Sequence, residues 1–198
     1  MSKLLPYRSY DERDVLNRFS TVEATLEAGT LVSISSFDPT KEEAVIETDT
    51  VNMGSASYVV NPHYVNAYYK VQTATSGAMR YAVNGMTLKD VKSVDELNRN
   101  LFYNPQKRTE LDCAFSGESI PIVTRGEFAI SDQAYVGTPG VNKLLTVGAN
   151  GKFEFVTYAE LTGKGMTMDY VIGKCLSKSG ACGGYERDGN SAFIFLDL

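Results

Sequence analysis

Ala192-Phe-Ile-Phe-Leu-Asp-Leu198 is an apolar run with the composition of a β-strand. Side chains alternate between the two faces of a strand, so Phe193 and Phe195 share one face, and the other face carries Ala192, Ile194, Leu196 and Leu198. Both faces are apolar, and each therefore has to be covered. Two explanations stay open: the strand lies centrally within one domain, or its second face meets another protein.

In the rest of the sequence, short β-type segments alternate with turn signals. A second strand-like run, Lys152-Phe-Glu-Phe-Val-Thr-Tyr158, comes before it, and residues 31–36 and part of 65–73 alternate in the same way. Asn84-Gly85, Gly183-Gly184 and similar pairs separate the segments. Strands at this spacing predict a small β-barrel or β-sandwich of short antiparallel strands.

One hairpin is predicted from residues 120–125 and 127–130, closed near Gly126. Pro121 has no amide hydrogen to donate to a neighbouring strand. It therefore favours a position at a sheet edge or at the start of its strand.

Helix signals are sparse. Asn104 and Pro105 suit the N-cap and the first position of a short helix that runs to Asp112. Residues 93–99 contain a Ser-x-x-Glu capping box but too few apolar positions to define a helix. Residues 1–20 show charge without an apolar stripe, which predicts an extended N-terminal arm. The predicted fold is therefore mainly β, with one or two short helices.

The chain length sets the number of domains. At 198 residues with 43% hydrophobic composition, the chain fits a single β-rich domain over residues 21–198, with a smaller lobe within 40–101 as an option. No apolar run approaches the roughly 20 residues of a membrane span. The N-terminus lacks an apolar stretch like that of a secretory signal. We therefore expect a protein made and kept on the cytoplasmic side, with no membrane partner.

Charge and cysteine content exclude further classes. The net charge is −5 and the basic residues are scattered, so no footprint for nucleic acid is present. Three cysteines, Cys113, Cys175 and Cys182, cannot all pair within one chain. The odd count favours free thiols, although Cys175 and Cys182 are placed to face each other across a hairpin. With a single histidine, His63, no zinc site is predicted.

Catalytic motifs are not apparent in the sequence. His63 lies beside proline and tyrosine, and no Gly-x-Ser-x-Gly elbow presents a serine to it. Residues 173–180 are rich in glycine and lysine but lack the order of a phosphate-binding loop. We therefore expect no enzymatic activity, no cofactor and no metal.

Tyrosines crowd one segment, which contains Tyr58, Tyr64, Tyr68 and Tyr69, whereas tryptophan is absent from the chain. Aromatic clusters occur in sugar sites, on base-stacking surfaces and at protein interfaces. Without surrounding basic residues, base stacking is disfavoured. Interface or core packing is the preferred interpretation over a sugar platform.

The order of these segments resembles that of the small head decoration, or cement, proteins of tailed bacteriophages. The resemblance is one of layout over most of the chain, with residues 40–101 the least similar part. The segments that carry it are Tyr10-Asp-Glu-Arg-Asp-Val15, Gly29-Thr-Leu-Val-Ser-Ile34, Asn104-Pro105 with its helix, Ser116-Gly-Glu-Ser-Ile-Pro-Ile-Val-Thr-Arg-Gly-Glu-Phe128, Val171-Ile-Gly-Lys-Cys-Leu176 and Phe193-Ile-Phe-Leu-Asp-Leu198.

The resemblance implies a structural virion protein without an active site. It would bind the outer surface of the capsid after assembly in the host cytoplasm, bridge subunits of the major capsid protein and form a homo-oligomer, with a trimer expected. Interfaces of this kind need exposed apolar or aromatic side chains and an arm that orders on docking. The candidate interface residues are Leu4, Leu5, Tyr7, Tyr10, Tyr64, Tyr68, Tyr69, Phe193 and Phe195.

Two alternatives remain. One is a carbohydrate-binding β domain that uses Tyr68 or Tyr69, and the other is a head-fibre or tail-base component of a virion. A sugar-binding domain predicts saturable binding that is lost when either tyrosine is replaced. A fibre or tail-base protein predicts stable elongated oligomers without any capsid.

Overall fold

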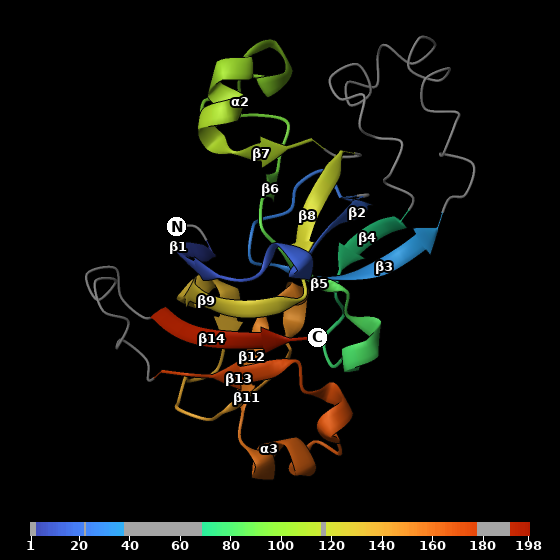
Figure 1. Cartoon of the computed structure of the whole chain (residues 1–198), viewed down its shortest axis with the longest axis vertical. Helices are drawn as coiled ribbons and strands as arrows, with labels where there is room; N and C mark the ends of the chain where they lie inside the picture. The colour runs from blue at the N-terminus through green and yellow to red at the C-terminus, as the bar shows by residue number, and fades with distance from the viewer. Residues whose placement is uncertain (1–2, 22, 38–68, 116–117, 178–190) are drawn as a thin grey trace.

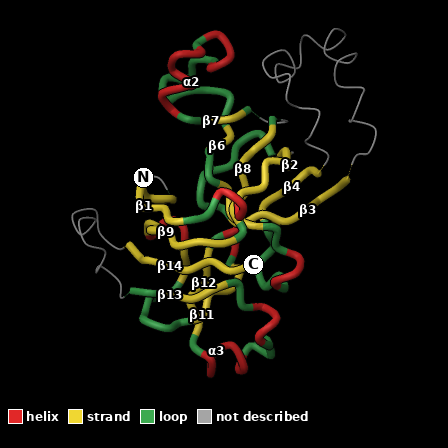
Figure 2. The backbone as a smooth tube through the Cα atoms, in the orientation of Figure 1, coloured by secondary structure: helices red, strands yellow, loops and turns green. Residues whose placement is uncertain are grey.

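The computed structural model describes residues 3–21, 23–37, 69–115, 118–177 and 191–198 (Figure 1). Over these residues the protein is mainly β, as predicted, with a seven-stranded sheet, a closed five-stranded barrel and a short two-stranded sheet. Figure 2 shows that the helices are short segments between the strands. In Figure 1 the barrel strands lie above the seven-stranded sheet, and α2 lies beyond the barrel.

The C-terminal apolar run forms β14 (Ser191–Asp197), which lies inside the seven-stranded sheet. It pairs antiparallel with β9 (Arg125–Ser131) on one side and with β13 (Gly173–Cys175) on the other. The strand order of the sheet is β1-β9-β14-β13-β11-β12-β10, and all neighbours are antiparallel except β10 and β12. The remaining strands are β1 (Leu4–Ser9), β10 (Tyr135–Val136), β11 (Leu144–Val147) and β12 (Phe153–Val156).

The side chains of β14 alternate between two faces, as predicted, but the two faces differ in burial. Ala192, Ile194 and Leu196 are fully buried in the core. Phe193 and Phe195 point to the opposite face and are half-buried. The strand is therefore central within one folded unit, while its second face is only partly covered by the described residues.

The barrel has the strand order β2-β4-β3-β5-β8 and closes through pairing of β8 with β2. Gly85 starts β5 with a φ of +146°, a backbone conformation that side chains oppose. A Cβ at this position would lie 2.5 Å from the Val123 carbonyl oxygen and against Ile122. Glycine is thus required where β5 meets β8. The barrel strands are β2 (Val15–Thr21), β3 (Leu31–Phe37), β4 (Tyr69–Thr73), β5 (Gly85–Thr87) and β8 (Ser119–Val123).

One hydrophobic cluster joins the barrel to the inner face of the seven-stranded sheet. Burial of a large apolar side chain contributes about 1.5–3 kcal/mol, so this shared cluster holds the two sheets together. Its fully buried members include Leu31, Met86 and Val123 from the barrel, and Phe128, Ile130, Leu145, Phe153 and Ile194 from the sheet.

The N-terminal segment is extended, as expected, but it does not project as an arm. Its first strand, β1, pairs with β9 at the edge of the seven-stranded sheet, and β2 belongs to the barrel. The charged residues between them form the 3-10 helix η1 (Glu12–Asp14). Leu4 and Phe19 are buried at 3% and 6% exposure, and this burial fixes the segment to both sheets.

The predicted hairpin at Gly126 is absent from the described residues, because β8 and β9 belong to different sheets. The chain crosses from the barrel to the seven-stranded sheet at Thr124. The Thr124 backbone N–H and hydroxyl both donate to the Asp14 carbonyl oxygen, at 2.9 and 3.1 Å. These bonds hold the crossing beside the point where η1 ends.

Pro121 lies in the middle of β8, between two neighbouring strands, and not at a sheet edge. The strand pairing of β2 with β8 shifts between Leu16 and Phe19, which face Ile122 and Ile120. Two β2 residues therefore stand opposite Pro121 in a bulge, where a missing N–H donor is tolerated.

A small lobe connects β6 (Asp90–Val91) to β7 (Cys113–Ala114), which pair in parallel. It contains η5 (Leu101–Tyr103) and the predicted helix α2 (Pro105–Leu111), with Asn104 at the N-cap. We call residues 92–112 the α2 lobe. This lobe overlaps only the end of the predicted 40–101 range, of which residues 40–68 lie outside the described part of the chain.

Within the α2 lobe, residues 95–99 form a turn around the buried Asp95 carboxylate. Its Oδ1 accepts hydrogen bonds from the Leu97 and Arg99 amides at 2.9 and 2.8 Å, and Oδ2 accepts from Arg99 Nε at 2.7 Å. The Arg99 amide first, and then the Arg99 side chain and the Leu97 amide, lower the pKa of the Asp95 carboxyl. The capping-box pattern in this stretch therefore does not start a helix, because Asp95 closes a turn instead.

The stabilisation that Asp95 gives is expected to depend on pH. A lowered folded-state pKa means that the contribution is complete above the unfolded-state value of about 3.9 and is lost as the pH falls through the folded-state pKa. NMR titration of the Leu97 and Arg99 amide shifts should therefore give a midpoint below about 3.9. The Asp95→Asn variant should show no such midpoint. A wild-type midpoint at or above the unfolded value would contradict the hydrogen bonding described for this turn.

A second short α-helix, α3 (Tyr158–Gly163), follows β12 and was not predicted. Thr157 and Glu160 form a capping box at its start, with the Glu160 carboxylate accepting from the Thr157 amide at 2.6 Å. The remaining 3-10 helices of the described residues are η4 (Arg80–Ala82), η6 (Asp132–Ala134), η7 (Ala149–Gly151) and η8 (Met168–Tyr170).

Candidate functional site

The outer face of the seven-stranded sheet displays aromatic rings around β14. Tyr7 on β1 packs edge-on against Phe193, with ring centroids 5.0 Å apart and planes at 82°. The Tyr7 hydroxyl donates to Glu127 Oε2 at 3.4 Å. Tyr7 is 41% exposed, so the pair is open to solvent. We call the surface formed by Tyr7, Arg125, Glu127, Lys174, Phe193, Phe195 and Asp197 the β14 face.

Strand register brings two cations to Phe195. The Lys174 Nζ and the Arg125 guanidinium carbon lie 5.8 and 5.9 Å from the centroid of its ring. Arg125 Nε also lies 3.5 Å from Asp197 Oδ1, an ion pair between half-exposed groups. Cation–π contacts at exposed sites contribute about 0.5–1 kcal/mol. The β14 face is therefore an aromatic surface bordered by charges of both signs.

A pocket of about 500 Å³ opens where β1 ends beside this face. Tyr10 and Phe195 both contribute to its lining, together with Asp11, Arg13 and Arg125. The Tyr10 ring stacks on the buried Phe128 ring, with centroids 5.9 Å apart and planes at 22°. The aromatic surface thus extends from β14 to the end of the N-terminal strand.

The structure brings four of the predicted interface residues, Tyr7, Tyr10, Phe193 and Phe195, to this region. Leu4 is instead a core residue, 3% exposed, because it faces the hydrophobic cluster shared by the two sheets. Leu5 is half-buried on β1. Tyr69 lies in the barrel, half-buried, with its ring 5.8 Å from that of Phe19. Tyr64 and Tyr68 lie outside the described residues.

Sequence reasoning missed the charged residues of the β14 face. Arg125, Glu127 and Lys174 stand opposite Asp197 or Phe195 only through the register of three strands. Alternation along one strand cannot reveal such neighbours, because they come from other parts of the chain. These charged residues can be identified only once the pairing of β9 and β13 with β14 is known.

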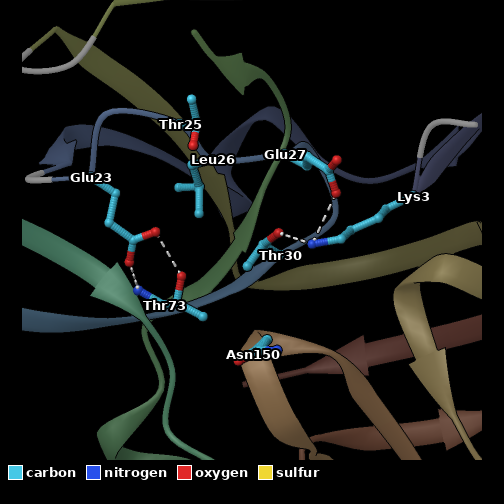
Figure 3. Close-up of a pocket in the computed structure, with 8 residues that line it drawn as sticks. All are labelled: Lys3, Glu23, Thr25, Leu26, Glu27, Thr30, Thr73 and Asn150. Carbon is cyan, nitrogen blue, oxygen red and sulfur yellow. Dashed lines mark hydrogen bonds and ion pairs between the residues drawn. The ribbon is translucent and has the colours of Figure 1, made fainter.

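A second pocket, of about 400 Å³, lies between the barrel and the β11–β12 turn (Figure 3). Glu23 accepts hydrogen bonds from the Thr73 amide at 2.6 Å and from the Thr73 hydroxyl at 2.9 Å. Lys3 donates to the Thr30 hydroxyl at 3.0 Å and pairs with Glu27 at 3.1 Å. The charged groups of this pocket already have partners within the chain. We therefore interpret the pocket as a structural contact and not as a ligand site.

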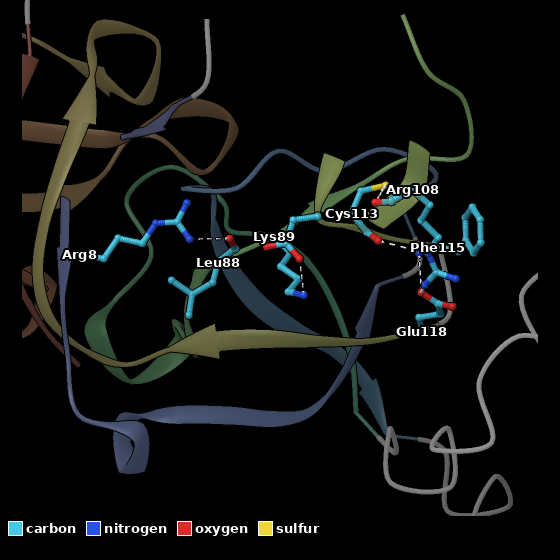
Figure 4. Close-up of polar contacts among 8 residues, drawn as sticks. Arg8, Leu88, Lys89, Arg108, Cys113, Phe115 and Glu118 are labelled. Carbon is cyan, nitrogen blue, oxygen red and sulfur yellow. Dashed lines mark hydrogen bonds and ion pairs between the residues drawn. The ribbon is translucent and has the colours of Figure 1, made fainter. Parts of the chain in front are cut away.

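A buried ion pair lies at the base of the α2 lobe (Figure 4). The Glu118 side chain is 2% exposed, and its Oε2 accepts from Arg108 Nη2 and from the Phe115 amide, the latter at 2.9 Å. The Arg108 guanidinium stacks 4.3 Å from the centroid of the Phe115 ring. The contact fixes α2 to the start of β8 and makes the pair a structural element of the lobe.

The described part of the chain gives little support for metal binding or for thiol chemistry. Three or more clustered His, Cys, Asp or Glu side chains that could hold a metal do not occur there. Burial raises the pKa of the Cys113 thiol, which disfavours a thiolate nucleophile. The Cys175 thiol is buried and donates to the Ser177 carbonyl oxygen at 3.0 Å. His63 and Cys182 lie outside the described residues.

None of the helices in the described ranges combines the length and apolar character needed to span a membrane. Comparison with known proteins finds no matching family model, no similar curated protein and no similar solved structure.

Proposed function

We propose that this protein is a structural virion component that binds the outer surface of a phage capsid and stabilises it by bridging subunits of the major capsid protein. The β14 face carries the proposal. The centres of protein interfaces are enriched in aromatic residues and arginine, and the β14 face presents Tyr7, Phe193 and Phe195 beside Arg125. Docking on a capsid subunit would complete the cover of the second face of β14.

In this function the protein acts as a homo-oligomer, and the resemblance to decoration proteins leads us to expect a trimer. Repetition of one contact over the shell gives high occupancy even when each contact is weak, because the subunits of an oligomer bind together. Mixed charges around the aromatic rings favour a defined orientation of docking over non-specific adhesion.

Binding to capsids should depend on Phe195. We expect purified protein to co-sediment saturably with expanded, undecorated phage heads and not with unexpanded proheads. The Phe195→Ala variant should bind at least tenfold more weakly, because an aromatic residue at an interface centre contributes about 2 kcal/mol or more. Co-sedimentation over a range of protein concentrations measures both effects.

Tyr158→Ala is the matched control, since Tyr158 is 69% exposed on α3 and lies outside the β14 face. It should bind as the wild-type protein does. Wild-type protein that binds neither form of the head would overturn the proposed function. Deletion of residues 1–20 is unsuitable here, because it removes β1 and most of β2 and would unfold both sheets.

A further inference from the structure

A cavity of about 590 Å³ is lined by residues of η4 and η8, which contact each other, and by Leu198. Val83 is buried, and Val171 and Leu198 are half-buried, so these three side chains form an apolar floor. The volume falls within the range of small-molecule sites in proteins. The cavity shares no lining residue with the β14 face or with the pocket at the end of β1.

An exposed aromatic ring stands at the rim of this cavity. Tyr81 is 80% exposed, and Met168 beside the same cavity is 56% exposed. Within the described residues the Tyr81 ring stacks on no other ring. Covering an aromatic ring that is exposed to water lowers the free energy of the system. The rim therefore favours a ligand with a flat apolar face.

The charged groups of the cavity keep unused hydrogen-bonding capacity. Asp169 Oδ2 accepts from the Thr167 hydroxyl at 2.9 Å, while Oδ1 accepts no hydrogen bond from the described part of the chain. Arg80 makes an ion pair with Asp197 at 3.6 Å through one terminal nitrogen and retains other N–H donors. This differs from the pocket of Figure 3, whose charged groups are paired internally.

These features define the chemistry of the ligand. A purely apolar ligand would desolvate Asp169 and Arg80 without replacing their bonds to water. A cationic ligand would be repelled by Arg80, and an anionic ligand would be repelled by Asp169. A neutral ring with an apolar face and hydroxyl groups at its edge satisfies both the tyrosine and the charged pair. We propose that this cavity binds a pyranose ring of a saccharide, with Tyr81 stacked on the ring and Asp169 and Arg80 bonded to its hydroxyls.

This site is independent of the proposed capsid function, since the protein can bind a saccharide whether or not it decorates a shell. The test is saturation-transfer difference NMR of the full chain with methyl glycosides of glucose, galactose and N-acetylglucosamine as probes. At least one probe should bind saturably, and Tyr81→Ala should weaken that binding about tenfold. Asp169→Asn should weaken it as well, because the amide loses one acceptor oxygen.

Tyr103→Ala is the control, since Tyr103 is 77% exposed in η5 and does not line the cavity. Its saccharide binding should equal that of the wild-type protein, and thermal melting should show that all three variants fold. The proposal is overturned if no glycoside binds, if Tyr81→Ala binds as well as Tyr103→Ala, or if cyclohexane-methanol, an apolar ring with one hydroxyl, binds as tightly as the glycosides.

Discussion

Replacement of Gly85 by alanine is expected to destabilise the barrel more than any conservative surface change. Gly85 has a φ of +146°, and an added Cβ would lie 2.5 Å from the Val123 carbonyl oxygen. The backbone conformation should cost about 1–3 kcal/mol for a residue with a side chain. Displacement of β8 should cost about 1–3 kcal/mol more. Urea denaturation followed by circular dichroism measures the resulting loss in the free energy of unfolding.

Gly163→Ala provides the same chemical change at a position without crowding. Gly163 ends α3, and among the described residues no atom outside its chain neighbours and the backbone of its own helix lies within 4 Å of a Cβ placed there. This variant should be as stable as the wild-type protein or more stable by up to about 1 kcal/mol, because alanine restricts the unfolded chain. If Gly85→Ala and Gly163→Ala unfolded at the same urea concentration, β5 could not meet β8 in the way described.

Replacement of Arg108 by methionine should be nearly as damaging. It leaves the Glu118 carboxylate, 2% exposed, with the Phe115 amide as its remaining donor among the described residues. Loss of one partner from a buried ion pair costs about 3–5 kcal/mol, because the other charge stays in a poorly solvated site. Urea denaturation gives the total cost, and hydrogen exchange of the α2 amides shows whether the lobe opens first.

Lys107→Met is the control for the lost positive charge. Lys107 precedes Arg108 on α2 and pairs with the exposed Glu110 at 3.5 Å, a contact worth at most about 1 kcal/mol. The double variant Arg108→Met/Glu118→Met should recover much of the stability lost by Arg108→Met, because it removes the isolated charge. Equal stability of Arg108→Met and Lys107→Met would show that the buried pair contributes little.

The sequence predicts local features of this fold well. Alternation along residues 192–196 correctly divides the side chains between the two faces of β14, and Asn104-Pro105 marks the start of α2. Both depend only on neighbouring residues. Helix α3 was missed although Thr157 and Glu160 have capping-box spacing, because the apolar run before it reads as a strand through Tyr158.

Pairing between distant segments could not be predicted in the same way. Residues 120–130 have the pattern of a hairpin, but β8 pairs with β2 and β5, and β9 pairs with β1 and β14. The N-terminal segment looks like a free arm for the same reason, since β9, the partner of β1, lies more than half the chain away. Local patterns specify strands, whereas burial of the shared core selects which strands pair.

The candidate site shows the same difference between local features, which the sequence predicts, and pairing between distant segments, which it does not. The sequence singles out Tyr7, Phe193 and Phe195 one by one as candidate interface residues. Their proximity and the cations beside Phe195 follow from the order β1-β9-β14-β13, which no single segment encodes.

The central place of β14 also governs how the chain reaches its native state. Among the described strands β14 is the last in chain order, yet it separates β9 from β13. Without β14, neither β9 nor β13 has its hydrogen-bonding partner on the side where β14 lies, and unpaired strand edges promote aggregation. Contacts of such long sequence separation slow folding. We therefore expect the larger sheet to close only after β14 has been synthesised, and we expect a chaperone that shields these edges until then to raise the yield of soluble protein.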